Sequence, residues 1–283
     1  MKKSIIYAFC ILAIALVACE PIEERDSIGS AISADKLDVK ATPIVVNGKN
    51  GNMVILENHS PVLSAWNCGG AVSSKSYDTV MVVKTGSIDV AFTGLNPDGT
   101  KISKNFTIQV DVLSTLPTEY KNLFGDPTQG ITSKKYVWDE TAGAVWGNGG
   151  YLGNTSPGWW TNDKAAMDKE DADYGSEGYM IFDLNGMTLK KSNAAGTKTE
   201  TGTASLDLSS KKLDGNGAVW ASAKLITKNV TVLKGVAPNG GNAPVYDYDI
   251  LKLSDSKLVL AWPEPGSGAW GTAWFWMFRK ADN

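Results

Sequence analysis

The stretch Thr272-Ala-Trp-Phe-Trp-Met-Phe-Arg-Lys280 near the C-terminus decides the class of fold. Trp274, Trp276 and Phe278 stand at every second position, so in an extended strand they share one face. Three large rings on one face of a strand indicate the interior of a β-barrel or of a two-sheet β-sandwich. We therefore expect all three rings in a core, together with Trp138 and Trp220.

Seven further apolar or alternating segments precede this strand in the C-terminal half of the chain. Gly, Asn and Asp clusters at 214–217 and 239–242 supply turns between some of them, and only 164–171 has a helical pattern. About eight strands in up-and-down order predict an antiparallel β-barrel or a two-sheet β-sandwich over residues 129–283. The candidate strands are 135–138, 178–184, 203–208, 218–225, 230–233, 246–253 and 257–262.

Residues 36–113 also show strand patterns, which predict a separate small antiparallel sandwich with Trp66 in its core. A tryptophan strand at 63–66 is followed by Gly69-Gly70, by Gly86-Ser-Ile-Asp-Val-Ala-Phe92, by the turn Asn96-Pro-Asp-Gly99 and by a final Thr-Ile-Gln-Val. Together these segments resemble an immunoglobulin-like domain of the PKD type, which implies a spacer or a weak adhesive module. Residues 114–128 are polar and punctuated by Pro and Gly, so we predict a linker that can contain a short helical turn at 119–124.

The C-terminal hairpin adds a second resemblance. Tyr246–Leu253, then Leu258-Val-Leu260 and then the strand ending in Phe278-Arg-Lys280 are similar to the end of lipocalin-like domains. The expected fold is thus all-β: an N-terminal Ig/PKD-like β-sandwich followed by a lipocalin-like antiparallel β-barrel or two-sheet β-sandwich. The glycine-rich insertion at 144–175 departs from the lipocalin-like pattern, which has a tight hairpin there.

The N-terminus predicts export. Lys2-Lys3 precede an apolar run from Ile5 to Val17, which is too short to span a bilayer comfortably as a helix. Leu16-Val-Ala-Cys19 resembles a bacterial lipobox, which implies a signal peptide over 1–18 and lipid attachment at Cys19. The acid-rich segment that follows lies in a flexible tether, 19–35, and resembles surface-export signals of Bacteroidetes lipoproteins. The expected location is the cell outer membrane, lipid-anchored and surface-exposed.

Composition narrows the function classes. The chain has 27 basic and 30 acidic residues, and removal of residues 1–18 leaves 25 against 30, a net charge of −5 that does not favour nucleic acid. Cys68 is the one cysteine left beyond the lipidated position, and His59 is the single histidine. A metal site rich in histidine or a catalytic triad chosen from several histidines is therefore excluded.

An enzyme is the less favoured class. Glycoside hydrolysis needs only two carboxylates at a set separation, so it stays open, with Asp139, Glu140, Asp163 and Glu264 as the residues of the right type. No strand carries an acidic motif, and neither a phosphate-binding loop nor a dinucleotide fingerprint occurs. We predict no catalytic residue, metal or cofactor; a calcium loop at Asp171, Asp173 and Glu177 is a weak alternative to a solvated helix end.

The insertion carries the candidate binding site. Aromatic side chains alternate there with Gly and Asn, and a second loop, 262–270, has the same character. Indole faces pack on the C–H faces of sugar rings, and Asn and Asp bond to hydroxyl groups. The same tryptophans could instead plug one end of the barrel. The predicted glycan-binding residues are Trp146, Asn148, Tyr151, Trp159, Trp160, Asn162, Asp163 and Trp270.

These features together resemble the surface glycan-binding proteins of Sus-type systems in Bacteroidetes. The resemblance implies a lipoprotein that captures a polysaccharide or oligosaccharide for a neighbouring outer-membrane transporter, with the lipid as its membrane contact. Two alternatives remain at this point. One is a lipocalin-like carrier of a small apolar ligand, and the other is a structural or adhesive lipoprotein without a small ligand.

Overall fold

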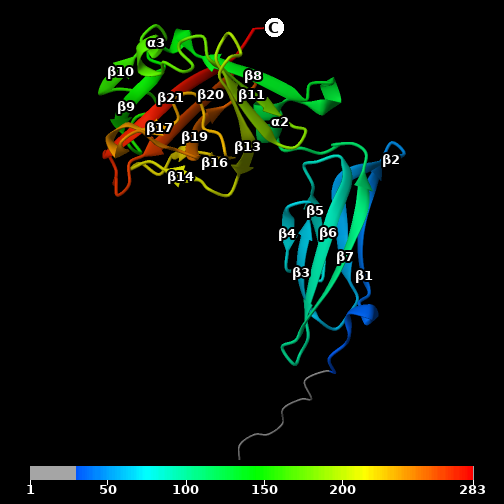
Figure 1. The fold of residues 1–283 in the computed structure, drawn as a ribbon. Coiled ribbons are helices and arrows are strands. Elements are labelled where there is room, and N and C mark those ends of the chain that lie inside the picture. The colour runs from blue at the N-terminus through cyan, green and yellow to red at the C-terminus, as the bar shows by residue number, and fades with distance from the viewer. Residues whose placement is uncertain (1–29, 283) are drawn as a thin grey trace, which may run out of the picture.

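The computed structural model describes residues 30–282, which form two antiparallel β domains in series (Figure 1). The N-terminal part contains two small sheets, and the C-terminal part is a closed barrel of eight strands. The expected all-β class, with a sandwich followed by a lipocalin-like barrel, is confirmed. The predicted signal peptide, Cys19 and most of the predicted tether lie outside the described residues.

The N-terminal domain pairs β1-β2-β5 in one sheet and β4-β3-β6-β7 in the other. Trp66 and Phe92, in neighbouring strands of the second sheet, pack edge to face with ring centroids 4.5 Å apart in the core. A short 3-10 helix, η1 (Ala34–Lys36), precedes the strands. The strands are β1 (Val39–Val46), β2 (Lys49–Asn58), β3 (Leu63–Cys68), β4 (Ala71–Ser73), β5 (Tyr77–Met81), β6 (Gly86–Leu95) and β7 (Lys101–Val110).

The last residues of the predicted tether are docked on this domain. Ile32 packs against the core, and its backbone N–H and C=O both bond to the side chain of Asn96. The described part of residues 19–35 therefore contributes contacts to the sandwich.

The barrel strands follow one another around the barrel in sequence order, and the last strand closes on the first. Phe278, Arg279 and Lys280 pair with Trp138, Val137 and Tyr136. The barrel strands are β8 (Ser133–Trp138), β11 (Tyr179–Asp183), β12 (Thr188–Ser192), β13 (Thr199–Asp207), β16 (Ala223–Lys228), β19 (Asp247–Leu253), β20 (Lys257–Pro263) and β21 (Thr272–Lys280).

The other elements of the C-terminal half lie outside the eight-stranded barrel sheet. They are α2 (Thr118–Phe124), η2 (Pro127–Gln129), η3 (Glu140–Ala142), β9 (Trp146–Gly150), β10 (Trp160–Asn162), α3 (Met167–Glu170), β14 (Lys212–Leu213), β15 (Val219–Ala221), β17 (Val236–Ala237), η4 (Pro238–Gly240) and β18 (Ala243–Pro244). Within residues 30–282, no helix combines the length and the apolar character needed to cross a membrane.

Strand β21 has two successive partners along one edge. Its C-terminal residues pair with β8, whereas Thr272–Trp276 pair with β9. Between these two segments the chain bulges out through η3. The far edge of β9 pairs with β10 and not with a barrel strand, so the insertion leaves the barrel as a hairpin.

Alternation along β21 separates two apolar clusters. Trp274, Trp276 and Phe278 are buried inside the barrel, as predicted, and Trp138 stacks on Phe278 at 4.7 Å. Phe275 points to the other side of the sheet and packs in a second cluster, here called the outer cluster. The outer cluster consists of Trp220, Ala221, Ala261, Ala273 and Phe275, with Tyr151, Leu152 and Leu251 packed against it. Trp220 is thus buried, as expected, but outside the barrel.

Two sequence predictions of local structure are wrong. The segment Val230–Leu233, predicted as a strand, is a loop. Its side chains Val230, Val232 and Leu233 are buried in the barrel core. The segment 218–225 is divided between β15 and β16, which belong to different sheets. Strand β12 was not predicted, since its polar lysines hide the alternation.

Within the segment predicted as a linker, helix α2 packs into the barrel core. Leu123 and Phe124 of α2 are fully buried, and Phe124 packs edge to face on Phe182 at 5.9 Å. The backbone carbonyl of Asn122 accepts hydrogen bonds from the Tyr136 hydroxyl (2.7 Å) and from Nζ of Lys134 (2.9 Å). Helix α2 therefore closes one end of the barrel.

This packing predicts that Phe124→Ala lowers the free energy of unfolding of the barrel by about 3 to 5 kcal/mol, because it opens a cavity among buried rings. Urea denaturation followed by tryptophan fluorescence measures the change. The exposed residue Thr118 on the same helix gives the control: Thr118→Ala should change stability by no more than about 0.5 kcal/mol. Equal, small effects of both substitutions would show that α2 is not part of the core.

Candidate functional site

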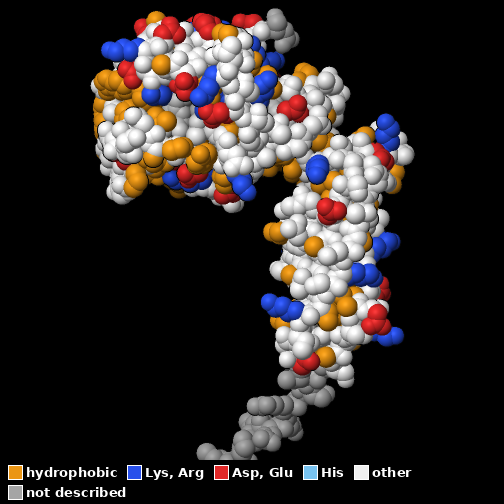
Figure 2. All heavy atoms as spheres, in the orientation of Figure 1, with side chains coloured by type: hydrophobic (Ala, Val, Ile, Leu, Met, Phe, Trp, Pro, Cys, Tyr) orange, Lys and Arg blue, Asp and Glu red, His pale blue; other side chains and the backbone are white. Residues whose placement is uncertain are grey.

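Three of the predicted rings are exposed on the barrel. Trp270 is 64% exposed, Trp159 54% and Trp160 41%; we call these three residues the tryptophan surface. Figure 2 shows hydrophobic side chains gathered on the flank of the C-terminal domain that lies away from the N-terminal domain. Figure 1 places β9, β10 and β17 in this region.

Trp270 lies flat on a glycine-rich backbone. A Cβ atom added at Gly150 would come within 2.5 Å of its indole, and one at Gly153 within 2.7 Å, so the ring contacts the loop where these side chains are missing. The backbone N–H of Trp270 donates to the backbone carbonyl of Tyr151 at 2.8 Å, and the backbone N–H of Tyr151 donates to the carbonyl of Gly271 at 2.7 Å. The ring is thus supported from beneath, and a large part of it remains open to a ligand.

Asn154 fixes the loop under Trp270. Its side-chain Oδ1 accepts a hydrogen bond from the Gly150 backbone N–H at 2.7 Å. Its backbone carbonyl accepts one from the Trp220 indole N–H at 2.8 Å. Tyr151 packs edge to face on Trp220 with ring centroids 5.2 Å apart. Tyr151 is therefore a half-buried support of the surface, anchored on the outer cluster.

Asn148 positions the other two exposed rings. Its carbonyl accepts from the backbone N–H groups of Gly158 and Trp159, and its Oδ1 accepts from the Trp160 N–H at 3.1 Å. Trp160 packs edge to face on Trp146 at 5.3 Å and on Trp274 at 5.8 Å. Asn148 is thus committed to backbone bonds that hold 158–160 in place.

The remaining predicted residues do not belong to the exposed aromatic surface. Trp146 is only 2% exposed and stacks on Trp274 at 5.1 Å, so it belongs to the barrel core. Asn162 is buried opposite Trp146 on the β9–β10 pair. Asp163 is exposed and its Oδ1 accepts from the Ala166 N–H, which starts the turn before α3. These three residues support the insertion and offer no exposed aromatic face to a ligand.

A cleft of about 610 Å³ is lined in part by Trp262, Glu264 and Pro265, which belong to the same loop as Trp270; sequence reasoning did not find it. We call it the Glu264 cleft; it lies between the segment 237–247 and the segment 262–265. Tyr246, 42% exposed, and the half-buried Trp262 supply aromatic walls. Oε1 of Glu264 accepts from the Trp274 indole at 2.9 Å and from the Asn239 amide. The aromatic composition of loop 262–270 was the available signal.

The charged residues around this cleft are mostly paired. Lys224 binds Asp247 at 2.6 Å, and Lys212 binds the buried Asp249 at 2.7 Å. Burial raises the pKa of Asp249 above its usual value, against the opposite effect of the Lys212 hydrogen bond. Glu264 has no ion pair within residues 30–282. Among the described residues, Glu264 is therefore the acidic side chain of the cleft lining that has hydrogen bonds but no ion pair.

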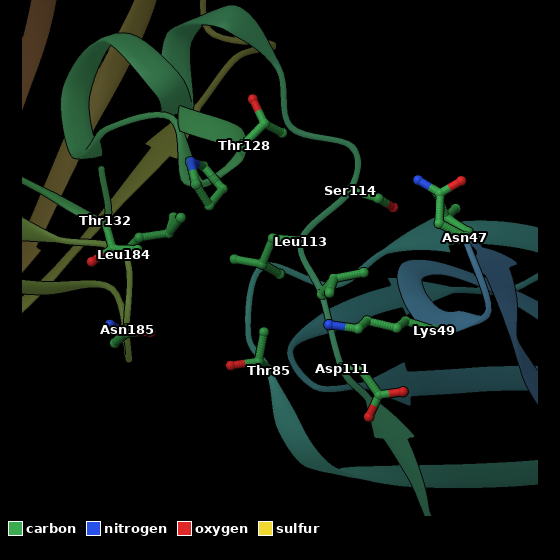
Figure 3. A pocket seen from close by; sticks show the side chains of 13 residues that line it. Asn47, Lys49, Thr85, Asp111, Leu113, Ser114, Thr128, Thr132, Leu184 and Asn185 are labelled. Atoms are coloured by element: carbon green, nitrogen blue, oxygen red, sulfur yellow. The ribbon is translucent and has the colours of Figure 1, made fainter. Parts of the chain in front are cut away.

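A second hollow of about 470 Å³ lies between the two domains (Figure 3). In this view Asn47 and Lys49 of the N-terminal domain face Thr128, Thr132 and Leu184 of the barrel across the connecting segment. Hydroxyl, amide and aliphatic groups line it together with the charged side chains of Lys49 and Asp111, and none of its lining residues is aromatic. It offers no stacking surface to a sugar ring.

The acidic residues considered for calcium are dispersed among separate partners. Asp173 pairs with Lys198 at 3.3 Å, Glu177 with Lys164 at 2.8 Å, and Asp171 accepts from the Lys234 N–H at 3.0 Å. No group of three or more His, Cys, Asp or Glu side chains suited to a metal occurs in the described part of the chain. Cys68 is buried, and burial raises its thiol pKa to about 11, so it is a poor nucleophile at neutral pH.

Comparison with known proteins gives no family model that matches the chain and no curated protein that matches it significantly. The site is therefore interpreted from its own geometry.

The role of Asn154 can be tested by amide hydrogen exchange. Asn154→Ala removes the acceptor of the Gly150 N–H, and the loss of one hydrogen bond, about 1 kcal/mol, should speed exchange in 150–160 about fivefold. Asn193→Ala is a matched control, because Asn193 Oδ1 accepts from backbone N–H groups in a different loop, 193–198. Unchanged exchange at 150–160 in Asn154→Ala would show that the loop is held by other contacts.

Proposed function

We propose that this protein is a lipid-anchored surface protein that binds a polysaccharide or oligosaccharide through its tryptophan surface. Trp270 carries the proposal: its ring is laid flat on Gly150 and Gly153 and is 64% exposed. Burial of apolar area usually keeps large rings inside, so three exposed indoles on hydrogen-bonded loops point to an interaction site.

The chemistry of the surface suits a sugar. An indole face packs on the axial C–H groups of a pyranose ring, and the polar groups nearby bond to its hydroxyls. The loop backbone is already fixed by Asn148 and Asn154, so little conformational entropy is lost when a ligand binds. Each ring contributes modestly, and repeated units on a long glycan raise the avidity.

The barrel interior offers less support for the alternative of an apolar cargo. Fully buried side chains that include Trp138, Trp276 and Tyr248 fill it, and α2 closes one end. The described residues therefore favour a ligand surface on the outside of the barrel over a cargo site in its interior. In the full proposal, the N-terminal domain acts as a spacer, and an outer-membrane transporter receives the glycan, as the resemblance to Sus-type proteins implies.

Affinity electrophoresis against a panel of polysaccharides tests the surface. Trp159→Ala, Trp160→Ala and Trp270→Ala should each weaken retardation by the bound glycan about 5- to 30-fold, corresponding to about 1 to 2 kcal/mol per ring.

Tyr77 gives the matched control, since it is an aromatic residue of the N-terminal domain with the same exposed fraction as Trp270, 64%. Tyr77→Ala should leave retardation unchanged. Retardation that survives the combined loss of all three tryptophans would disprove the proposed site, and so would a panel in which no glycan retards the wild-type protein.

The anchor is tested separately in cells that supply a labelled fatty acid. Because the thioether forms on the Cys19 sulfur, Cys19→Ala should abolish acyl labelling, whereas Cys10→Ala, within the predicted signal peptide, should retain it. A labelled Cys19→Ala protein would refute lipid attachment at this position.

A further inference from the structure

We infer that the Glu264 cleft is a subsite for a positively charged amino-sugar unit of the bound glycan. The inference rests on the proposed function, since it names the chemical class of one sugar unit next to the tryptophan surface. Three observations support it: the position of the cleft, the state of the Glu264 carboxylate and the aromatic walls.

One buried ring, Trp274, connects the Glu264 carboxylate with the tryptophan surface. Trp160 packs on Trp274 with centroids 5.8 Å apart, and the Trp274 indole N–H donates to Glu264 Oε1 at 2.9 Å. The Trp274 side chain therefore lies between the exposed ring of Trp160 and the carboxylate of Glu264 and contacts both. Trp270 and Glu264 belong to the same loop, 262–270, so the inference places a neighbouring unit of a glycan that lies on the rings at the cleft.

The Glu264 carboxylate is held through one oxygen and open at the other. Oε1 takes both the Trp274 and the Asn239 hydrogen bonds, whereas Oε2 has no hydrogen bond or ion pair with any of residues 30–282. Asp247, the other acid of the cleft, is occupied by Lys224. The cleft therefore presents one fixed, uncompensated negative charge.

The walls match the body of an amino sugar. Tyr246 and Trp262 present aromatic surface to the same space, next to Pro244 and Pro265. An ammonium group is attracted by aromatic faces and forms a charge-assisted hydrogen bond with a carboxylate. A sugar that carries a free amine satisfies both features, with its C–H face on a ring and its ammonium at Oε2 of Glu264.

Two hexasaccharides with the same β-1,4-linked glucosamine backbone isolate the amine. One carries free amines and the other is fully N-acetylated. Titration calorimetry in a mildly acidic buffer, in which the amines are protonated, gives the affinity of the full chain for each. The wild-type protein should prefer the free-amine hexamer about fivefold, the upper range for a partly exposed charge pair.

Glu264→Gln is the test variant, because its amide oxygen still accepts from Trp274 and only the charge is lost. The preference should fall to about one while the affinity for the acetylated hexamer is retained, which also reports that the fold is intact. Glu177→Gln is the charge-matched control, because Glu177 is 68% exposed at its side chain and does not line the cleft, and it should keep the preference.

The outcomes separate this inference from the proposed function. A wild-type protein without preference, or an equal loss of preference in Glu264→Gln and Glu177→Gln, overturns the amine subsite and indicates general charge attraction. Loss of all binding in the three tryptophan variants together with an unchanged preference in Glu264→Gln leaves the glycan surface standing and overturns the subsite. Free-amine binding that persists without the tryptophans but disappears in Glu264→Gln supports the subsite and contradicts the tryptophan surface.

Discussion

The division of β21 between two partners determines most of what is distinctive in the barrel. Three residues at its C-terminal end close the barrel against β8, and its first five residues pair with β9. Because β9 continues the line of β8 after a bulge, its free edge is available to β10. The backbone hydrogen bonds of the barrel are thereby completed at one end, while at the other end the same edge leads into a projecting hairpin.

That arrangement also sorts the aromatic side chains. On β21, Trp274 points inside and Phe275 outside, so one strand supplies both the interior and the outer cluster. The interior holds Trp146, which supports Trp160 by edge-to-face packing. The outer cluster holds Trp220, which supports the loop under Trp270 through Asn154. The exposed rings on this flank are thus tied to packed side chains below them, which explains how large apolar groups are kept at the surface in defined positions.

Sequence periodicity predicted the fold class and the burial of Trp274, Trp276 and Phe278, because alternation in a strand is a local property. It could not distinguish Trp146 from Trp270. Both stand in glycine-rich surroundings, and their fates depend on long-range register: Trp146 is opposite Trp276 inside the barrel, whereas Trp270 occupies a turn with positive φ. The role of α2 was hidden for a similar reason, since a seven-residue helix reveals its buried face only through distant partners such as Phe182. The Glu264 cleft depends on two segments, 237–247 and 262–265, that meet only in the folded chain.

The connection between the two domains has a mechanical consequence. The buried amide of Asn52 bonds to the Thr115 backbone through both its nitrogen (2.7 Å) and its oxygen (2.9 Å). Seven residues later, Asn122 bonds to the barrel at Leu253 and receives the Tyr136 hydroxyl. The connection between the domains is therefore short and fixed by hydrogen bonds at both ends, which restricts how far the barrel can turn relative to the sandwich.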